Sequence, residues 1–291
     1  MPLVDFHMHT THSDGSYTPT ELMRYCKKKN LACISVTDHD TMSGYDEAER
    51  EAKTLGLELI PGVEISAQFE PGTLHILGFF LDRQDPELNR WLGEIQKARR
   101  ERNPQIIEKL NKLGIDITLE EVIREACGQS EMPPGKQLGR PHFAKVLLKK
   151  KVIENFPEAF DKYLGKGKAA YVDKRRITSQ EAIQVINRSG GIASVAHPKQ
   201  MKLAGAPLEK EIARLVDEGL GGIEVFNSCQ DANENALYLR LAKRFNLVAT
   251  AGSDFHGANK PDTDLGFMGE GVRVGYDMVE ELREHIRQHK G

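Results

Sequence analysis

The sequence predicts an α/β fold in which a mostly parallel sheet or barrel is wrapped by helices. Short β-rich runs alternate with helical patterns toward both ends of the chain, and several of the helical patterns begin with clear capping signals. The middle is different, because no strand pattern is found between residues 82 and 170. These observations predict an α/β host interrupted by an all-helical insertion.

Seven β-rich runs are visible, one fewer than the strands of the usual eight-stranded (β/α) barrel. They span residues 3–6, 33–37, 57–63, 74–79, 192–196, 222–226 and 247–251.

Two of the helices have well-defined starts. Thr18-Pro19-Thr20-Glu21 is a capping box with proline at the first helical position, and it predicts a helix to about Lys29. Thr178-Ser179-Gln180-Glu181 is a second box, which predicts a helix closed by Gly190-Gly191.

In the middle segment, residues 87–113 are predicted to form one long helix or two, with Asn103-Pro104 as the break. Another helix is expected to start at 118–121. Residues 128–141 are rich in turn formers and predict a loop, and a short helix follows from His142. The predicted division is a barrel made of residues 1–99 and 172–291, with a helical insertion at 100–171.

Composition excludes several classes of protein. With 39% hydrophobic residues, 26 Gly and 13 Pro among 291 residues, the chain is neither disordered nor collagen-like. No apolar run approaches the roughly 18–20 residues that span a membrane, and the first ten residues do not resemble a signal peptide. The four cysteines are scattered and form no CxxC pair, which favours reduced thiols and a cytoplasmic location.

The net charge of −3 hides an asymmetry. Residues 97–176 carry 19 Lys+Arg and 11 Asp+Glu, a net +8, so the remainder carries a net −11. A basic segment within an acidic scaffold suggests an anionic substrate held near the insertion. Arg99, Arg102 and Arg140 are the candidates for this binding, because a guanidinium grips phosphate in a bidentate way. Runs such as Lys149-Lys150-Lys151 are interpreted as a solvated surface.

Histidines and carboxylates gather at the ends of the predicted strands. Side chains two residues apart in an extended chain point to the same side, so the HxH of the first strand can reach one ion. Barrels of this kind place their sites at the carboxyl ends of the strands. The candidates that follow the successive strands are His7 and His9, His39, Glu64, His75, His197, and Asp254 with His256.

Mixed imidazole and carboxylate ligands suit Mn²⁺, Zn²⁺ or Fe²⁺, and suit Mg²⁺ less well. More than six ligands are too many for one ion, so the pattern predicts two or three divalent ions. Clustered divalent ions suit the hydrolysis of a phosphate ester, because they bind its oxygens, lower the pKa of a water and stabilise the leaving oxygen. His12, His142, His285 and His289 are individually more typical of ordinary structural or surface histidines.

The motifs DFHMHTTHSDG, TDHD and SDFH, with Glu64, His75 and His197, resemble those of the polymerase-and-histidinol-phosphatase (PHP) domain superfamily. The resemblance covers about 1–99 and 172–291. It implies a distorted seven-stranded, TIM-like (β/α) barrel of the amidohydrolase-like kind with a two- or three-metal phosphoesterase site. The basic insertion with GRPH at 139–142 is similar to a bacterial subgroup of phosphatases for 3′,5′-bisphosphate nucleotides and 5′-to-3′ exonucleases on short RNA.

Carried over by motif, the resemblance implies one metal held by His7, His9, Glu64 and Asp254. Glu64 would bridge to a second metal at His75 and His197, and Asp14, His39 and His256 would hold a third. His12 is the alternative to Asp14, which is favoured because SDG makes a turn that presents a carboxylate. A plain hairpin turning at 70–73 would place His75 four residues from the partner of Glu64, too far to share a metal pair, so the resemblance requires a different path there.

The function predicted first is a metal-dependent phosphatase acting on nucleotides, with 3′,5′-bisphosphates as the favoured substrate and Mn²⁺ as the favoured ion before Zn²⁺, Fe²⁺ or Mg²⁺. Glu64, Asp254 and His256 are predicted to be catalytic. Arg99, Arg102, Arg140 and His142 would bind substrate, and a metal-bound water, His142 or His256 would protonate the leaving group. The partners expected are a small phosphate ester or short single-stranded RNA, with no membrane and no obligate protein partner. Histidinol phosphate is the alternative substrate. An amidohydrolase with a carboxylated lysine and a metal-bearing scaffold with a dead site are the rival classes; no lysine stands where Glu64 does, and no expected ligand is missing.

Overall fold

Seven strands form one sheet whose spatial order follows the chain. The structure is a computed structural model that describes residues 2–129, 131–133, 135–172 and 177–289. The strands are β1 (Leu3–Asp5), β2 (Leu31–Val36), β3 (Glu58–Ala67), β4 (Leu74–Phe79), β5 (Ile192–Val195), β6 (Gly222–Asn227) and β7 (Val248–Gly252). All seven predicted strands are therefore confirmed; their ends shift by no more than two residues, except that β3 continues four residues beyond the predicted end, to Ala67.

The sheet curls until its first and last strands meet. The backbone N–H of Phe6 donates to the carbonyl of Ala251 at 3.0 Å, and Met8 bridges Phe255 just beyond the two strands. Strand β4 runs antiparallel to both β3 and β5, whereas the other neighbouring pairs are parallel. The predicted α/β class and the distorted seven-stranded barrel are confirmed.

Strands β3 and β4 form a hairpin, which corrects the expected path between Glu64 and His75. Ser66 pairs with His75 and Glu64 pairs with Leu77, so the connection is longer than the four-residue turn expected at 70–73. His75 lies two residues from the partner of Glu64, not four. Side chains two residues off register on one face are diagonal neighbours and reach each other. No departure from a hairpin is needed.

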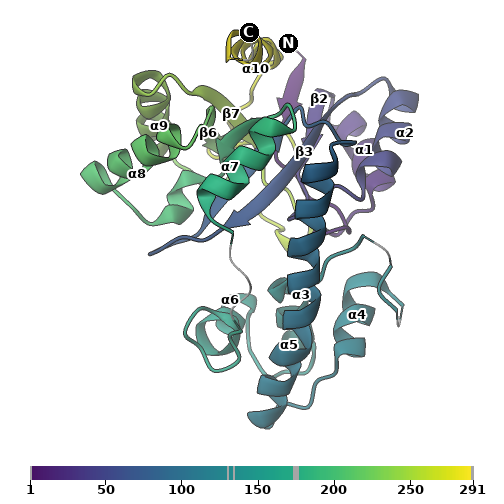
Figure 1. Ribbon diagram of the computed structural model, residues 1–291. Helices are drawn as coiled ribbons and strands as arrows, with labels where there is room; N and C mark the ends of the chain where they lie inside the picture. Colours follow the sequence, from purple (N-terminus) through teal and green to yellow (C-terminus); the bar gives the residue numbers. More distant parts are fainter. Residues whose placement is uncertain (1, 130, 134, 173–176, 290–291) are drawn as a thin grey trace.

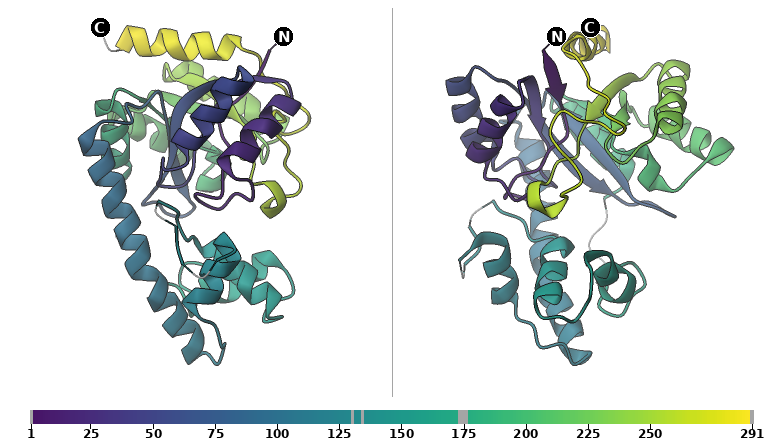
Figure 2. Two further views of the ribbon diagram at one scale, coloured as in Figure 1. Left: turned by 90° about the vertical axis from the view of Figure 1, so that its right-hand side faces the viewer. Right: turned by 180° about the vertical axis from the view of Figure 1, so that it is seen from behind.

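Helices α1 (Pro19–Lys28), α2 (Tyr45–Leu55), α7 (Ser179–Arg188), α8 (Gly205–Asp217) and α9 (Ala232–Arg244) pack around the barrel (Figure 1). Both predicted capping boxes are present, at Thr18 and Thr178. Helix α10 (Asp277–His289) crosses the end of the barrel at which both chain termini lie (Figure 2). Short helices η2 (Pro198–Met201) and η3 (Gly257–Asn259) follow β5 and β7.

A single helix, α3 (Pro86–Lys112), runs from the barrel to the second group of helices (Figure 1). The predicted break at Asn103-Pro104 is wrong, because the helix continues through Pro104. Arg102 and Asn103, in the turn just before Pro104, are buried and hydrogen-bonded to each other, and these contacts hold that turn of the helix in place. Tertiary packing thus overrides the local preference of proline.

The second group contains α4 (Leu119–Cys127), α5 (Arg140–Lys149), α6 (Phe156–Ala159) and the π-helix η1 (Phe160–Leu164). We call it, together with the second half of α3, the cap. Its own apolar core includes Ile106, Leu110, Phe143 and Leu147. No described residue between 82 and 172 lies in a strand. Thr118 caps α4 as predicted, and α5 begins at Arg140, two residues before the expected start.

The domain boundaries at 99/100 and 171/172 stay a prediction. Helix α3 crosses the first without interruption, and the second adjoins residues 173–176, which are outside the described part of the chain. Across the described residues, no helix combines the length and apolar character needed to cross a membrane.

Candidate metal centre

The nine predicted ligands lie together at one mouth of the barrel. His7 and His9 follow β1, His39 follows β2, Glu64 and His75 lie within β3 and β4, His197 follows β5, and Asp254 and His256 follow β7. Asp14 comes from the loop after His9. The close approach of β7 to β1 depends on Gly252, because a Cβ there would lie 2.1 Å from the Cβ of His7. The absence of a side chain at Gly252 therefore lets β7 approach β1 closely enough for the predicted ligands on both strand ends to meet.

Glu64 is fully buried and lies at the centre of the cluster. Its two carboxylate oxygens face different histidines. Oε1 lies 2.8 Å from His75 Nδ1 and 2.9 Å from His197 Nε2. Oε2 lies 2.9 Å from His39 Nδ1, 3.3 Å from His9 Nε2 and 3.4 Å from His7 Nε2. This is the geometry of a carboxylate that can bridge two metal ions.

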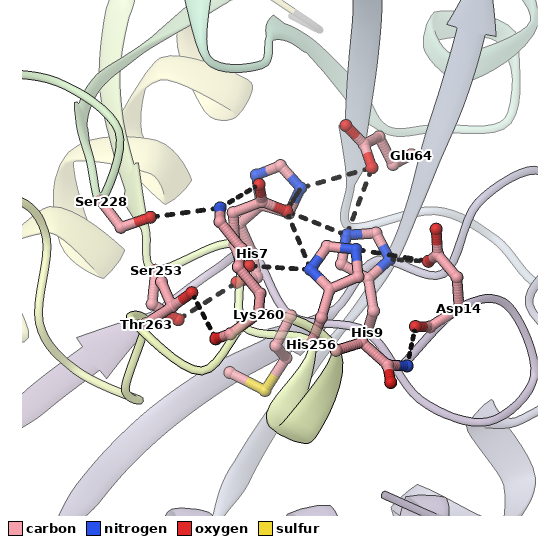
Figure 3. A network of polar contacts seen from close by, with 12 residues as sticks. His7, His9, Asp14, Glu64, Ser228, Ser253, His256, Lys260 and Thr263 are labelled. Carbon is pink, nitrogen blue, oxygen red and sulfur yellow. Dashed lines mark hydrogen bonds and ion pairs between the residues drawn. The ribbon is translucent and has the colours of Figure 1, made fainter. Parts of the chain in front are cut away.

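Asp254 and Asp14 are the other two carboxylates of the cluster, and Figure 3 shows Asp14 on the same side of the histidines as Glu64. Asp254 Oδ1 lies 3.3 Å from the Nε2 atoms of both His7 and His9. Asp14 Oδ1 lies 3.3 Å from His256 Nε2, and Asp14 Oδ2 lies 3.7 Å from His39 Nε2.

Four groups of ligand atoms, each within 4.8 Å of one another, can be drawn among the described residues. They are His7, His9 and Asp254; His7, Glu64 and His197; His39, Glu64 and His75; and His9, Asp14, His39 and His256. His12 belongs to none of these groups, and its Nδ1 lies 2.7 Å from Ser43 Oγ.

Buried polar atoms without a hydrogen-bond partner show that this cluster fits metal ions. Among the described residues they include His7 Nε2, His9 Nε2 and Asp14 Oδ1, each 3.3 Å or more from its nearest ionic partner. Buried polar atoms are ordinarily satisfied. Here they converge on the same volume, and nitrogen and oxygen ligands of this kind suit divalent metal ions.

Burial and the charges of neighbouring residues shift the pKa values of several side chains in the cluster. Burial lowers the pKa of His39, but Glu64 and Asp14 outweigh burial and raise it to about 9. His75 contacts the same Glu64, yet burial dominates and lowers its pKa to about 4. The surrounding histidines hold the pKa of Glu64 well below its usual range, although burial opposes them. Perturbed pairs of this kind are typical of functional sites.

A cavity of about 480 Å³ adjoins the cluster and extends under the cap. Asp14, His39 and His75 line it on the barrel side, and Arg99, Arg102 and Arg140 line it on the cap side. Phe69, Phe160 and Tyr171 contribute aromatic rings. Three of the nine predicted metal ligands and the three predicted substrate arginines therefore share one cavity. His142, the fourth predicted substrate residue, is not among the described lining residues, and its Nδ1 lies 3.0 Å from the backbone N of Gly139.

The three arginines differ in their surroundings. Arg99 donates through Nε to Asp40 Oδ2 at 2.8 Å and pairs with the same oxygen through Nη2. Arg102 is 5% exposed and donates to Asn103 Oδ1 at 2.9 Å, with no ion pair to any described residue. Burial, together with the charges of Arg99 and Arg140, lowers the pKa of Arg102 to about 9. A buried cation without a counter-ion is a candidate anion-binding group.

Sequence reasoning missed three residues that support the ligands. Glu224 lies 3.0 Å from His7 Nδ1, Lys260 Nζ donates to Asp254 Oδ2 at 2.8 Å, and Asp38 accepts from Thr10 N at 2.8 Å and Ser13 Oγ at 2.5 Å. Glu224 had one signal, since it is the only charged residue in the apolar run 222–226. Lys260 carries no comparable signal.

The model of the PHP domain family matches residues 5–220. A 5′-3′ exoribonuclease of Haemophilus influenzae is 35% identical over 252 residues, covering 87% of this chain and 89% of the relative. A 3′,5′-nucleoside bisphosphate phosphatase of Chromobacterium violaceum is 32% identical over 266 residues, covering 91% of both chains. A solved structure from Bifidobacterium adolescentis, described as a metal-dependent phosphoesterase, superposes with a TM-score of 0.84 at 29% identity and covers 97% of this chain and 96% of its own.

Proposed function

The chain belongs to the PHP domain family, whose relatives are metal-dependent phosphoesterases, and from this premise we propose that it removes a phosphate from 3′,5′-bisphosphate nucleotides to leave a 5′-nucleotide. The observation that carries the proposal is the shared cavity, in which the Asp14, His39 and His75 side of the proposed metal cluster and three arginines face one space. Its volume of about 480 Å³ lies within the range of small-ligand sites. A substrate with two phosphates would place one phosphate at the proposed metal cluster and the other at the arginines on the cap side of the cavity.

The proposed ligand sets follow the sequence prediction. His7, His9, Glu64 and Asp254 would hold one ion, and Asp14, His39 and His256 would hold another. His75 and His197, which both lie near Glu64 Oε1, would hold the remaining ion together with Glu64. Asp14 is favoured over His12, because Asp14 contributes to the compact groups. We expect Mn²⁺, which suits imidazole and carboxylate together.

When bound, the divalent ions polarise the phosphoryl oxygens and lower the pKa of a water molecule. The protein contributes the remaining functions. Arg102 and Arg140 bind the second phosphate, while Arg99, which is paired with Asp40, shapes the wall beside them. The rings of Phe69, Phe160 and Tyr171 are the candidate stacking surfaces for a base. His256 is kept as a proposed ligand and not as the proton donor to the leaving oxygen, because a nitrogen that coordinates a metal carries no proton and the other ring nitrogen faces the carbonyl of Asp254 at 2.9 Å.

The test is a phosphate-release screen with Mn²⁺ over nucleoside mono- and bisphosphates, histidinol phosphate, sugar phosphates and short RNA. We expect kcat/KM for a 3′,5′-bisphosphate to exceed that for the matching monophosphate by ~10-fold or more, since one charge-assisted hydrogen bond contributes roughly 1.5–3 kcal/mol. Equal rates across all substrates would remove the nucleotide assignment and leave the phosphatase intact. Preference for histidinol phosphate would select the alternative substrate.

Hydrolysis of short RNA from its 5′ end is the second candidate, favoured by the 35% identical exoribonuclease and by the aromatic rings in the cavity. Both activities use the same metal centre. Binding of short oligonucleotides as a function of salt separates them, because several backbone contacts give a steep decline in affinity with salt and a single terminal phosphate gives a shallow one.

A further inference from the structure

Glu224 lies inside the barrel on β6, fully buried, and contacts the segments that follow two strands which are not neighbours in the sheet. Its Oε1 lies 3.0 Å from His7 Nδ1, after β1. Its Oε2 accepts from the backbone N–H of His197 at 2.6 Å, after β5, and from Asn227 Nδ2 at 3.0 Å. Glu224 is not one of the nine predicted ligands.

The contact with His7 decides which ring nitrogen is free. An ionised carboxylate only accepts hydrogen bonds, so the nitrogen that faces it must carry the proton. His7 Nδ1–H therefore donates to Glu224, and the lone pair of Nε2 points toward Glu64 and Asp254, 3.4 and 3.3 Å away. His7 Nε2 is also one of the buried atoms without a hydrogen-bond partner.

The contact with His197 restrains an unusual backbone. His197 has φ +28° and ψ 66°, a conformation that residues with a Cβ rarely adopt, and proline follows it. The short hydrogen bond from its N–H to Glu224 holds this conformation. As a result His197 Nε2 lies 2.9 Å from Glu64 Oε1, and the rings of His7 and His197 stack with centroids 5.6 Å apart.

We propose that Glu224 is a positioning residue that sets the tautomer of His7 and the backbone of His197, so that both Nε2 atoms face Glu64 across the proposed metal site. The inference rests on the proposed metal role of these histidines. Partners of this kind typically change metal affinity by ~10–100-fold when they are removed.

Glu224→Gln tests the two contacts together. The amide oxygen of glutamine can accept from only one of the two N–H groups, since its NH₂ would then face the other as a donor against a donor. Thr250→Val is the matched control. Thr250 pairs in register with Glu224, is 1% exposed, and its hydroxyl contacts Ser194 Oγ at 3.1 Å. Both variants lose a buried polar contact, but only Glu224→Gln alters contacts with predicted ligands, namely His7 and His197.

Two readouts are needed: Mn²⁺ affinity by calorimetry, and the protonation of the histidine rings by ¹⁵N NMR of the Zn²⁺-loaded protein. We expect Glu224→Gln to weaken Mn²⁺ binding by ~10-fold or more and to remove one protected Nδ1–H signal that the native protein shows. Thr250→Val should change neither. If Glu224→Gln fails to fold, the native spectrum still decides, because His7 protonated at Nε2 would overturn the inference.

The failures are distinguishable. A native protein that binds no Mn²⁺ would overturn the proposed function, whatever the variants do. A native protein that binds Mn²⁺, with Glu224→Gln binding it equally tightly, would overturn only the role of Glu224.

Discussion

Glu64 links the residues of the proposed metal centre, because its two oxygens face five histidines that come from four different segments of the barrel. Burial opposes a charge at this position, and the histidines around it offset that cost by holding the pKa of Glu64 well below its usual range. The carboxylate therefore stays available as a bridging ligand.

Glu64→Gln should reduce bound metal and lower kcat by ~1,000-fold or more, because the amide has one acceptor oxygen and no charge, and such metal stabilisation amounts to several kcal/mol. Metal content by mass spectrometry and steady-state kinetics measure the two effects. Glu58→Gln is the control, since Glu58 lies on the same strand but pairs with Tyr276 and Arg283 at 2.5 Å. Full metal content and activity in Glu64→Gln would refute the bridging role.

Arg102 illustrates a conflict between stability and binding at the residue scale. Its folded-state pKa is lowered to about 9 by burial and by Arg99 and Arg140, whereas in the unfolded chain it stays near the ordinary arginine value. Charged Arg102 therefore destabilises the fold at neutral pH. This penalty is complete below about pH 9 and decreases as the pH rises further, where the folded protein releases the proton first.

Arg102→Met should accordingly raise the free energy of unfolding of the phosphate-free protein at pH 7 by ~1 kcal/mol and lower kcat/KM for a bisphosphate nucleotide by ~10–100-fold. Denaturant unfolding at pH 7 and pH 10 checks the first effect, which should be smaller at pH 10. Arg100→Met on the exposed side of the same helix is the comparison. A destabilised Arg102→Met protein with unchanged kinetics would contradict both statements.

At the scale of elements, α3 is the least conventional part of the chain, because it continues through Pro104. Proline has no N–H for the carbonyl four residues earlier, so the turn lacks one hydrogen bond. Buried residues on either side, among them Arg102, Asn103 and Ile106, hold the helix together across this point.

Pro104→Ala restores the missing donor on an exposed face and should stabilise the protein by ~1–3 kcal/mol, with kcat and KM unchanged. Equilibrium unfolding and kinetics on the same preparation measure this. Loss of stability, or a higher KM, would mean that the proline shapes α3 in a way the cap requires.

The loop before α5 docks the cap onto the barrel. Ser43 Oγ donates to the carbonyl of Gly135 at 2.8 Å, and the N–H of Gln137 donates to the carbonyl of His12 at 2.9 Å. Gly135 has φ +78°, and a Cβ there would lie 2.5 Å from Ser43 Cβ. His12, an alternative metal ligand by sequence, thus contributes to docking through its backbone and through its contact with Ser43.

Gly135→Ala should raise KM for the nucleotide, because the added methyl group pushes the loop from the barrel and displaces the cavity wall. Gly114→Ala is the matched control, with φ +79° and no atom within 4 Å of its Cβ position. Both substitutions should cost roughly 1 kcal/mol of stability from the positive φ. Equal KM values in the two variants would show that the docking contact does not shape the substrate site.

At the scale of the whole molecule, the barrel brings many buried imidazoles and carboxylates into one volume, where several polar atoms lack hydrogen-bond partners. An ion that binds the folded state and not the unfolded chain stabilises the fold by mass action. Chelation should therefore lower the melting temperature by ~5–10 °C, and Mn²⁺ at ~100 times its dissociation constant should restore it. Calorimetry measures the change, which Glu64→Gln should not show. Identical melting curves with and without Mn²⁺ would argue against a resident ion.

Local sequence determined much of this architecture. The seven strands, the capping boxes at Thr18, Thr118 and Thr178 and the order of ligand motifs are short-range features, set by alternation, by capping side chains and by the positions where strands end. Because the carboxyl ends of parallel strands share one edge of the barrel, the proximity of residues such as His7 and Asp254 could be predicted from the sequence alone.

Tertiary structure decided what depends on long-range register and packing. The diagonal contact of Glu64 with His75 follows from the pairing of Ser66 with His75, which loop chemistry at 70–73 did not specify. The continuity of α3 through Pro104 depends on buried neighbours, and the separate environments of Arg99 and Arg102 depend on which of them reaches Asp40. Glu224 contacts two of the proposed ligands, His7 and His197, whose strands are not neighbours in the sheet, a relation that exists only once the barrel has closed.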